Sequence, residues 1–145
     1  MKNPAILNIL IVEDDHNTRT TIRVMLHEIG VKTIFEAEDG KSAEETLSAS
    51  RGNISLIISD WNMPNKTGFE FLKGLQVTHP DIPFLMVTAR ADQGSVVNAK
   101  NFGADGYLLK PFTLEELKKK LFTVLQEQDG GEEKPLNIPE DGALA

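Results

Sequence analysis

The sequence contains no cysteine and only three histidines, His16, His27 and His79, which lie far apart along the chain. Without cysteine the protein has no disulfide framework, no thiolate metal site and no cysteine nucleophile. A zinc site built on histidine is also disfavoured, because such a site needs several imidazole or thiolate ligands close together. Any metal ion is therefore expected to be bound by oxygen atoms.

Long apolar runs and an excess of basic residues are also lacking. No stretch reaches the roughly 18 to 20 apolar residues of a bilayer-spanning helix, and the first residues do not form a secretory signal, so we expect a cytoplasmic protein. The 22 acidic residues outnumber the 15 basic ones, and most of the net charge of −7 lies after residue 126. A nearly neutral body with an acidic tail has no basic stripe, which disfavours binding to nucleic acid or to a membrane surface.

Short apolar stretches alternate with amphipathic ones along the 145 residues, which suffice for one domain. Strands are predicted at 7–12, 33–37, 54–59, 84–88 and 106–109. Helices are predicted up to Gly30, around 43–47 and 71–75, at 96–102, and from a capping box at 113–116. This alternation predicts an α/β fold with a doubly wound five-stranded parallel sheet. We assign residues 5–127 to this domain and the acidic residues 128–145 to a flexible tail.

Polar residues follow four of the predicted strands, where ligands bind in an open parallel sheet. They are 13–15 (Glu-Asp-Asp), Asp60, Thr88 and Lys110. Carboxylates gathered in one place repel each other, and a divalent cation relieves that repulsion; oxygen ligands favour Mg²⁺. Together with Lys110, Mg²⁺ would neutralise a phosphoryl group in transfer, and Thr88 would donate a hydrogen bond to it. Asp60, at the end of the most buried strand, is the predicted acceptor.

Each of these residues also has an ordinary explanation when it is taken alone. Acids after a strand commonly cap the next helix and complement its dipole. Thr88 is unremarkable in a strand, and a lysine such as Lys110 is usually a solvated charge. A single tyrosine such as Tyr107 is commonly half-buried packing. The prediction of a phosphoryl site therefore rests on the combination of residues and their order.

The combination resembles the receiver domain of two-component response regulators, over about residues 7–126. Four motifs carry the resemblance: Glu13-Asp14, 59–64 (SDWNMP), 87–89 (VTA) and 110–112 (KPF). The runs 36–40 (EAEDG), 59–65 (SDWNMPN) and 110–113 (KPFT) are most similar to the chemotaxis regulators of the CheY type. The resemblance implies the (βα)5 flavodoxin-like receiver fold.

The resemblance also implies a role for each residue of the site. Asp60 is the site of phosphorylation. Asp14, Asp60 and the backbone carbonyl of Asn62 are Mg²⁺ ligands, and Glu13 acts on the ion through water. Glu13 stands where the most similar relatives have Asp, which is a common variant in the family.

Further residues are implied in phosphoryl binding and in switching. Thr88 and Lys110 match the residues that bind the phosphoryl group, and Tyr107 matches an aromatic residue that moves inward when Thr88 moves. A cis peptide bond is implied between Lys110 and Pro111. Arg90 stands where the most similar relatives have Glu, so the lifetime of the phosphorylated state does not carry over.

The function implied is that of a stand-alone response regulator. A sensor histidine kinase would supply the phosphoryl group, and the surface of the fourth helix, fifth strand and fifth helix would then bind a partner, with a flagellar motor switch protein as the downstream candidate. The alternative is a relay intermediate that passes the group to a histidine phosphotransfer protein. Catalysis would be limited to its own phosphorylation and dephosphorylation, so we do not expect an enzyme. A phosphatase of the haloacid dehalogenase type is disfavoured, because Asn62 stands where that type has its acid.

Overall fold

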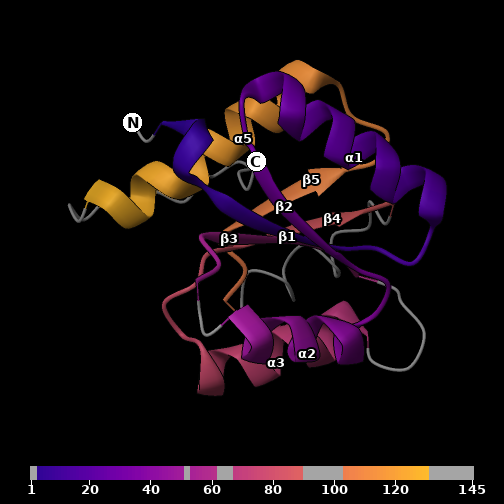
Figure 1. Ribbon diagram of the computed structural model, residues 1–145, viewed down its shortest axis with the longest axis vertical. Helices are drawn as coiled ribbons and strands as arrows, with labels where there is room; N and C mark the ends of the chain where they lie inside the picture. Colours follow the sequence, from indigo (N-terminus) through magenta and orange to yellow (C-terminus); the bar gives the residue numbers. More distant parts are fainter. Residues whose placement is uncertain (1–2, 51–52, 62–66, 90–102, 131–145) are drawn as a thin grey trace.

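A parallel sheet with the strand order β2-β1-β3-β4-β5 organises the fold (Figure 1). The computed structural model describes residues 3–50, 53–61, 67–89 and 103–130. The strands are β1 (Asn8–Val12), β2 (Thr33–Ala37), β3 (Leu56–Asp60), β4 (Phe84–Thr88) and β5 (Gly106–Leu109). The predicted five-stranded parallel sheet is confirmed, and every strand begins and ends within two residues of its predicted range.

Within the described residues, four α-helices and one short 3-10 helix accompany the strands. They are η1 (Pro4–Ile6), α1 (His16–Ile29), α2 (Gly40–Ser50), α3 (Gly68–Thr78) and α5 (Leu114–Gly130). The helix predicted at 96–102 lies outside the described residues. As predicted, α1 stops at Gly30, whose φ of 118° is in the left-handed region that glycine adopts most easily.

Helix α5 begins as the sequence predicts and ends later. The capping box forms, since Glu116 N donates to Thr113 Oγ1 at 3.1 Å and Thr113 N donates to the Glu116 carboxylate at 2.9 Å. The helix then continues to Gly130, so residues 128–130, which the sequence analysis assigned to the flexible tail, are helical. Gln and Asp at 128 and 129 do not break a helix.

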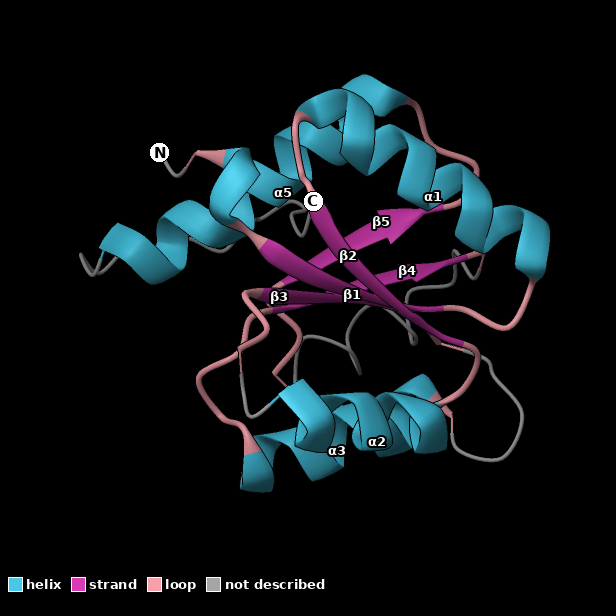
Figure 2. Ribbon diagram, viewed as in Figure 1, coloured by secondary structure: helices cyan, strands magenta, loops and turns pink. Residues whose placement is uncertain are grey.

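The helices cover the sheet on both faces, with α1 and α5 on one side and α2 and α3 on the other (Figure 2). Two apolar clusters fill the two interfaces. One joins β-strand residues such as Ile9 and Ile58 to Leu26 of α1 and Leu121 of α5. The other packs residues from alternate strand positions against Leu47 of α2 and the aromatic and leucine side chains of α3. The central strands are buried on both faces, which explains their nearly continuous apolar sequences.

The strand order reverses between β1 and β3, because the chain passes from β1 to β2 on one side and then to β3 on the other. Ligands of open α/β sheets bind at the carboxyl ends of the strands that flank such a reversal. Among the described residues, none of the helices has the length and apolar character to cross a bilayer. The cytoplasmic location stays a prediction.

Candidate functional site

Three carboxylates meet at the carboxyl ends of β1 and β3. Glu13 and Asp14 follow β1, and Asp60 is the last residue of β3; the register pairs Val12 with Ser59, so the acids that come next lie side by side. One carboxylate oxygen from each acid lies within 4.8 Å of the other two. Glu13 is 2% exposed and Asp60 8% exposed, whereas Asp14 is open to solvent.

Lys110 provides a cation for this cluster. Its Nζ lies 2.8 Å from Glu13 Oε1 and 3.5 Å from Asp60 Oδ2. Lys110 follows β5, and its backbone N–H donates to the carbonyl of Thr88 at 2.9 Å, which ties the end of β5 to the end of β4. The cis peptide bond predicted between Lys110 and Pro111 is present. The structure thus brings together four of the predicted site residues.

Burial shifts the ionisation of both buried acids. It raises the pKa of Glu13, against the hydrogen bond from Lys110, and it raises the pKa of Asp60, against the positive charge of Lys110. Burial works in the opposite direction on the pKa of Lys110, but the hydrogen bond to Glu13 and the charge of Asp60 outweigh it and raise that pKa. Among the described residues, one ammonium faces three carboxylates, so these groups together carry an excess of negative charge.

The donor set fits a hard divalent cation. All three groups offer carboxylate oxygens, and a further positive charge would offset the repulsion that their burial creates. Glu13 already uses Oε1 for Lys110 and Oε2 to accept from Asp15 N at 3.1 Å, an arrangement in keeping with its predicted indirect role. The third predicted ligand, the carbonyl of Asn62, lies outside the described residues.

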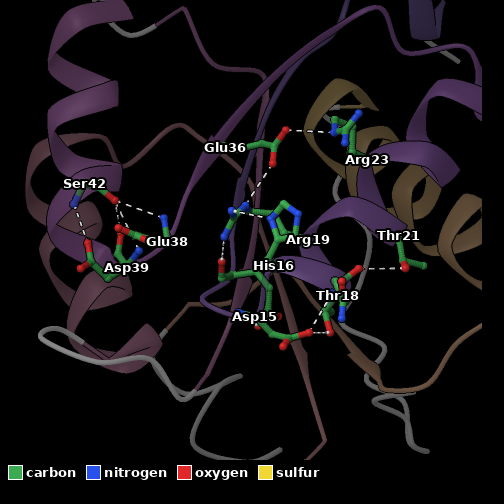
Figure 3. Close-up of polar contacts among 12 residues, drawn as sticks. Asp15, His16, Thr18, Arg19, Thr21, Arg23, Glu36, Glu38, Asp39 and Ser42 are labelled. Carbon is green, nitrogen blue, oxygen red and sulfur yellow. Dashed lines mark hydrogen bonds and ion pairs between the residues drawn. The ribbon is translucent and has the colours of Figure 1, made fainter.

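Asp15, which the sequence analysis grouped with the strand-end acids, is a helix cap instead. Its carboxylate accepts from Thr18 N at 2.8 Å and from Thr18 Oγ1 at 2.6 Å (Figure 3). These hydrogen bonds lower the pKa of Asp15. The physical reason is that the first turn of α1 has unpaired N–H groups, and the nearest carboxylate satisfies one of them. The ordinary explanation of acids after a strand therefore holds for this residue.

Thr88 and Tyr107 lie on one face of the sheet beside the carboxylates. The register pairs Asp60 with Val87, so Thr88 is one residue beyond the end of that pairing, and it is 1% exposed. Met86 pairs with Tyr107 and Thr88 pairs with Leu109. Since side chains alternate along a strand, Thr88 projects to the same face as Met86 and Tyr107. Tyr107 is half-buried against the cluster on that face.

Gly68 is the first residue of α3, and the backbone of the site requires a glycine there. Its N–H donates to the carbonyl of Trp61 at 2.7 Å. A Cβ atom at Gly68 would overlap the carbonyl oxygen of Asp60 and lie 2.8 Å from Trp61 Cα. The start of α3 can therefore approach the acceptor strand only if this residue has no side chain. Trp61, in turn, donates its N–H to Asp60 Oδ1 at 2.8 Å.

A comparison with protein families agrees with this geometry. The family described as the response regulator receiver domain matches residues 9–122. The chain belongs to this family. The chemotaxis protein CheY of Pseudomonas aeruginosa is 35% identical over 126 residues, which are 86% of this chain and all of that protein. The receiver domain resemblance drawn from the sequence is confirmed.

Solved receiver structures have the same fold. The chemotaxis protein CheY4 of Vibrio cholerae matches with a TM-score of 0.76 at 35% identity, over 83% of this chain and all of that one. A chain from the CheX-CheY-BeF3-Mg complex of Borrelia burgdorferi matches with a TM-score of 0.78 at 21% identity, over 85% of this chain and 98% of that one. The chain is thus a CheY-like receiver domain with the predicted sheet.

Proposed function

We propose that Asp60 accepts a phosphoryl group from a histidine kinase. The supporting observation is the place of its carboxylate, at the end of a central strand, 8% exposed, beside two other acids and 3.5 Å from Lys110 Nζ. An oxygen of Asp60 forms a bond to phosphorus while the bond from phosphorus to the donor's imidazole nitrogen breaks, and that nitrogen takes up a proton. The product is a mixed anhydride, which is labile enough for a transient signal.

Mg²⁺ is the cation that this set of oxygen ligands favours. We expect Asp14 and Asp60 to bind it directly, the carbonyl of Asn62 to be a further ligand, and Glu13 to act through water. When bound, Mg²⁺ offsets negative charge on the phosphoryl oxygens. The Borrelia structure holds Mg and BeF3, but at 21% identity it supports only the fold. The argument here rests on the three carboxylates of this chain.

Lys110 and Thr88 are the chain's own groups for the phosphoryl oxygens. Lys110 Nζ already contacts Glu13 and Asp60, so it is within reach of a group attached to Asp60. Thr88 has a buried hydroxyl on the neighbouring strand, on the face that it shares with Tyr107. Movement of Thr88 toward the phosphoryl group would open space on that face for Tyr107. Phosphorylation at Asp60 would in this way change the surface formed by β5 and α5.

The output would be the binding of a protein partner. A partner that prefers the phosphorylated surface shifts the population of states only as far as its affinities for the two states differ. The CheY relatives are named as chemotaxis proteins, which supports a flagellar motor switch protein as the downstream partner. We do not assign turnover of external substrates to this chain, because Asn62 stands where an aspartyl phosphatase would need a general acid.

A phosphoryl acceptor assay tests the proposal. The protein is incubated with MgCl₂ and labelled acetyl phosphate, and the modified residue is mapped. Asp60→Asn should abolish labelling, whereas Asp81→Asn, which changes an exposed acid outside the site, should be labelled as the wild type is. Labelling of Asp60→Asn at the wild-type rate would show that the acceptor is another residue.

A second assay separates the two possible outputs. Phosphorylated protein is mixed with a histidine phosphotransfer protein or with a flagellar motor switch protein. Retention of the label together with binding to the switch protein supports the chemotaxis output. Rapid loss of the label to the phosphotransfer protein supports the relay alternative.

A further inference from the structure

Arg19 links the acidic pocket to the rest of the fold through the backbone of Glu13. Its Nη1 donates to the carbonyl oxygen of Glu13 at 2.7 Å. Its Nε donates to Glu36 Oε1 at 3.0 Å (Figure 3). The Arg19 side chain is 16% exposed. A guanidinium holds its donors in a fixed plane, so these two contacts define its position and that of the carbonyl it binds.

The carbonyl of Glu13 needs this donor because the neighbouring strand has ended. Glu13 N still donates to Ala37 O at 3.0 Å, one step past the last pair of the β1–β2 ladder. If the parallel ladder continued, the Glu13 carbonyl would accept from the N–H of Asp39. That N–H instead points to Ser42 Oγ, at 3.4 Å, because the chain turns into α2. The Arg19 guanidinium therefore supplies the hydrogen bond to the Glu13 carbonyl that a continued β2 strand would have supplied.

We propose that Arg19 is a positioning residue for the divalent cation of the phosphoryl-accepting site. It fixes the carbonyl of Glu13, and hence the turn that carries the Glu13 and Asp14 side chains between β1 and α1. This inference rests on the function proposed above. Nothing in the sequence motifs indicates it, because Arg19 lies on a helix several residues beyond the acids and makes its contact through the backbone.

The direction in which Mg²⁺ affinity changes when Arg19 is replaced distinguishes a positioning role from a purely electrostatic one. Arg19 is a positive charge near the acids, so by electrostatics alone its removal would strengthen the binding of Mg²⁺. As a positioning residue it has the opposite effect, since a loosened turn must be ordered again when the ion binds. Arg23 supplies the matched control. Its Nε lies 3.0 Å from Glu36 Oε2, so it pairs with the same acid, but among the described residues it is Arg19 and not Arg23 that donates to the Glu13 carbonyl.

Mg²⁺ titrations of four proteins test the proposal: wild type, Arg19→Met, Arg19→Lys and Arg23→Met. Emission of Trp61, whose backbone N–H donates to Asp60 Oδ1 next to the site, reports binding. Arg19→Met should raise the Kd for Mg²⁺ by about three- to tenfold, the range expected for one lost hydrogen bond. Arg19→Lys should give an intermediate value, because it keeps the charge and one donor. Arg23→Met should leave the Kd unchanged or slightly lower.

A measurement without metal completes the test and guards against a variant that is merely unstable. In EDTA, amide hydrogen exchange at Asp14 and Asp15 should be faster in Arg19→Met than in wild type, while exchange in β3 and β4 stays the same. Equal exchange at the turn, or a Kd for Mg²⁺ that is unchanged or lower in Arg19→Met, would overturn the proposal. If all amides exchange faster in Arg19→Met, Arg19→Lys decides: a Kd equal to that of wild type overturns the proposal, and a raised Kd supports it.

Failure of this inference differs from failure of the proposed function. If the wild type binds Mg²⁺ but acetyl phosphate does not label it, the proposed function fails and the role of Arg19 in holding the turn stands or falls on the titrations alone. If the wild type is labelled at Asp60 and Arg19→Met binds Mg²⁺ as tightly as wild type, the role of Arg19 fails and the proposed function stands.

Discussion

Two clusters of carboxylates and cations lie on either side of the Glu13 backbone and have opposite balances of charge. In the pocket cluster, Glu13 and Asp60 share the ammonium of Lys110, with Asp14 close by. In the second cluster, which we call the Glu36 cluster, one carboxylate lies 3.0 Å from the guanidinium groups of both Arg19 and Arg23. Within the part of the chain that the structure describes, the pocket cluster has more negative than positive groups, and the Glu36 cluster has more positive than negative ones.

The two clusters also differ in how far their carboxylates are buried. The Glu13 side chain is 2% exposed and that of Glu36 is 33% exposed. A buried carboxylate without full compensation raises its own pKa and attracts a cation, whereas a half-exposed ion pair is screened by water and contributes little to stability. The comparison shows that the same chemical groups make a site for ligands in one place and a link between β2 and α1 in the other. Four predictions test it.

The largest effect is expected from the backbone contact that holds the pocket together. Gly68→Ala should lower the free energy of unfolding by about 3 kcal/mol, because the new methyl group overlaps the carbonyl of Asp60. Urea unfolding measures it. Gly74→Ala is the control in the same helix: its Cβ would meet only Glu44 Oε2, at 3.7 Å, so the protein should gain up to about 1 kcal/mol. Equal effects of the two changes would contradict the close approach.

Removing the cation of the pocket should have the next largest effect. Lys110→Met leaves Glu13 and Asp60 buried together without their ammonium, and we expect a loss of about 2 kcal/mol in EDTA at pH 7. The value is below that for a fully buried pair because the Lys110 side chain is 21% exposed. Urea unfolding in EDTA and in MgCl₂ checks it, and Mg²⁺ should restore part of the loss. No loss in EDTA would mean that the pocket does not depend on Lys110.

The pH dependence of stability should show which cluster holds carboxylates whose negative charge is not balanced by nearby cations. Folding raises the pKa of Glu13 and Asp60 above their ordinary values of 4.5 and 3.8, so the folded state binds protons more tightly than the unfolded state does. Their contribution to stability is complete below the ordinary values and is lost as the pH rises through the raised ones. The lowered pKa of Asp15 has the opposite effect: its contribution to stability is complete above the ordinary value of 3.8 and is lost only as the pH falls below that value.

The metal-free protein should therefore lose stability, seen as a falling Tm, as the pH rises above the ordinary pKa values of Glu13 and Asp60. Asp60→Asn removes one of the two titrating groups, so its Tm should fall less over the same range. Thermal unfolding in EDTA gives both curves. A wild-type Tm that rises with pH, and rises more than the Tm of Asp60→Asn, would be the opposite of the expected change and would contradict the raised pKa values.

The sequence predicted the parts of this structure that depend on local pattern. Apolar runs bounded by polar residues located all five strands, because strands buried on both faces have few polar positions. The chemistry of the strand ends then located Asp60, Glu13 and Lys110, since parallel strands bring their carboxyl ends to one edge. Roles assigned through the family, such as that of Tyr107 in switching, stay predictions.

Features that depend on contacts between distant segments were not predicted. The approach of Gly68 to Asp60 is set by the packing of α3 on the sheet, and a glycine at the first position of a helix has no distinct sequence signal. Arg19 was equally hidden, because its partner is a backbone carbonyl. Asp15 was wrongly grouped with the site, since a cap and a ligand look alike in sequence. Only the position of Thr18 N–H distinguishes them.

The smallest effect is expected in the Glu36 cluster. Glu36→Gln removes a half-exposed charge but keeps an oxygen that can accept from Arg19, so the free energy of unfolding should change by no more than about 0.5 kcal/mol. The Kd for Mg²⁺ should also stay within about twofold, because Arg19 keeps its hydrogen bond to the Glu13 carbonyl. Urea unfolding and the Trp61 titration measure the two quantities. A loss as large as that of Lys110→Met would mean that the exposed ion pairs of Glu36 stabilise the fold as strongly as the buried pair of Glu13 and Lys110. The difference in burial between the two clusters would then have no effect on stability.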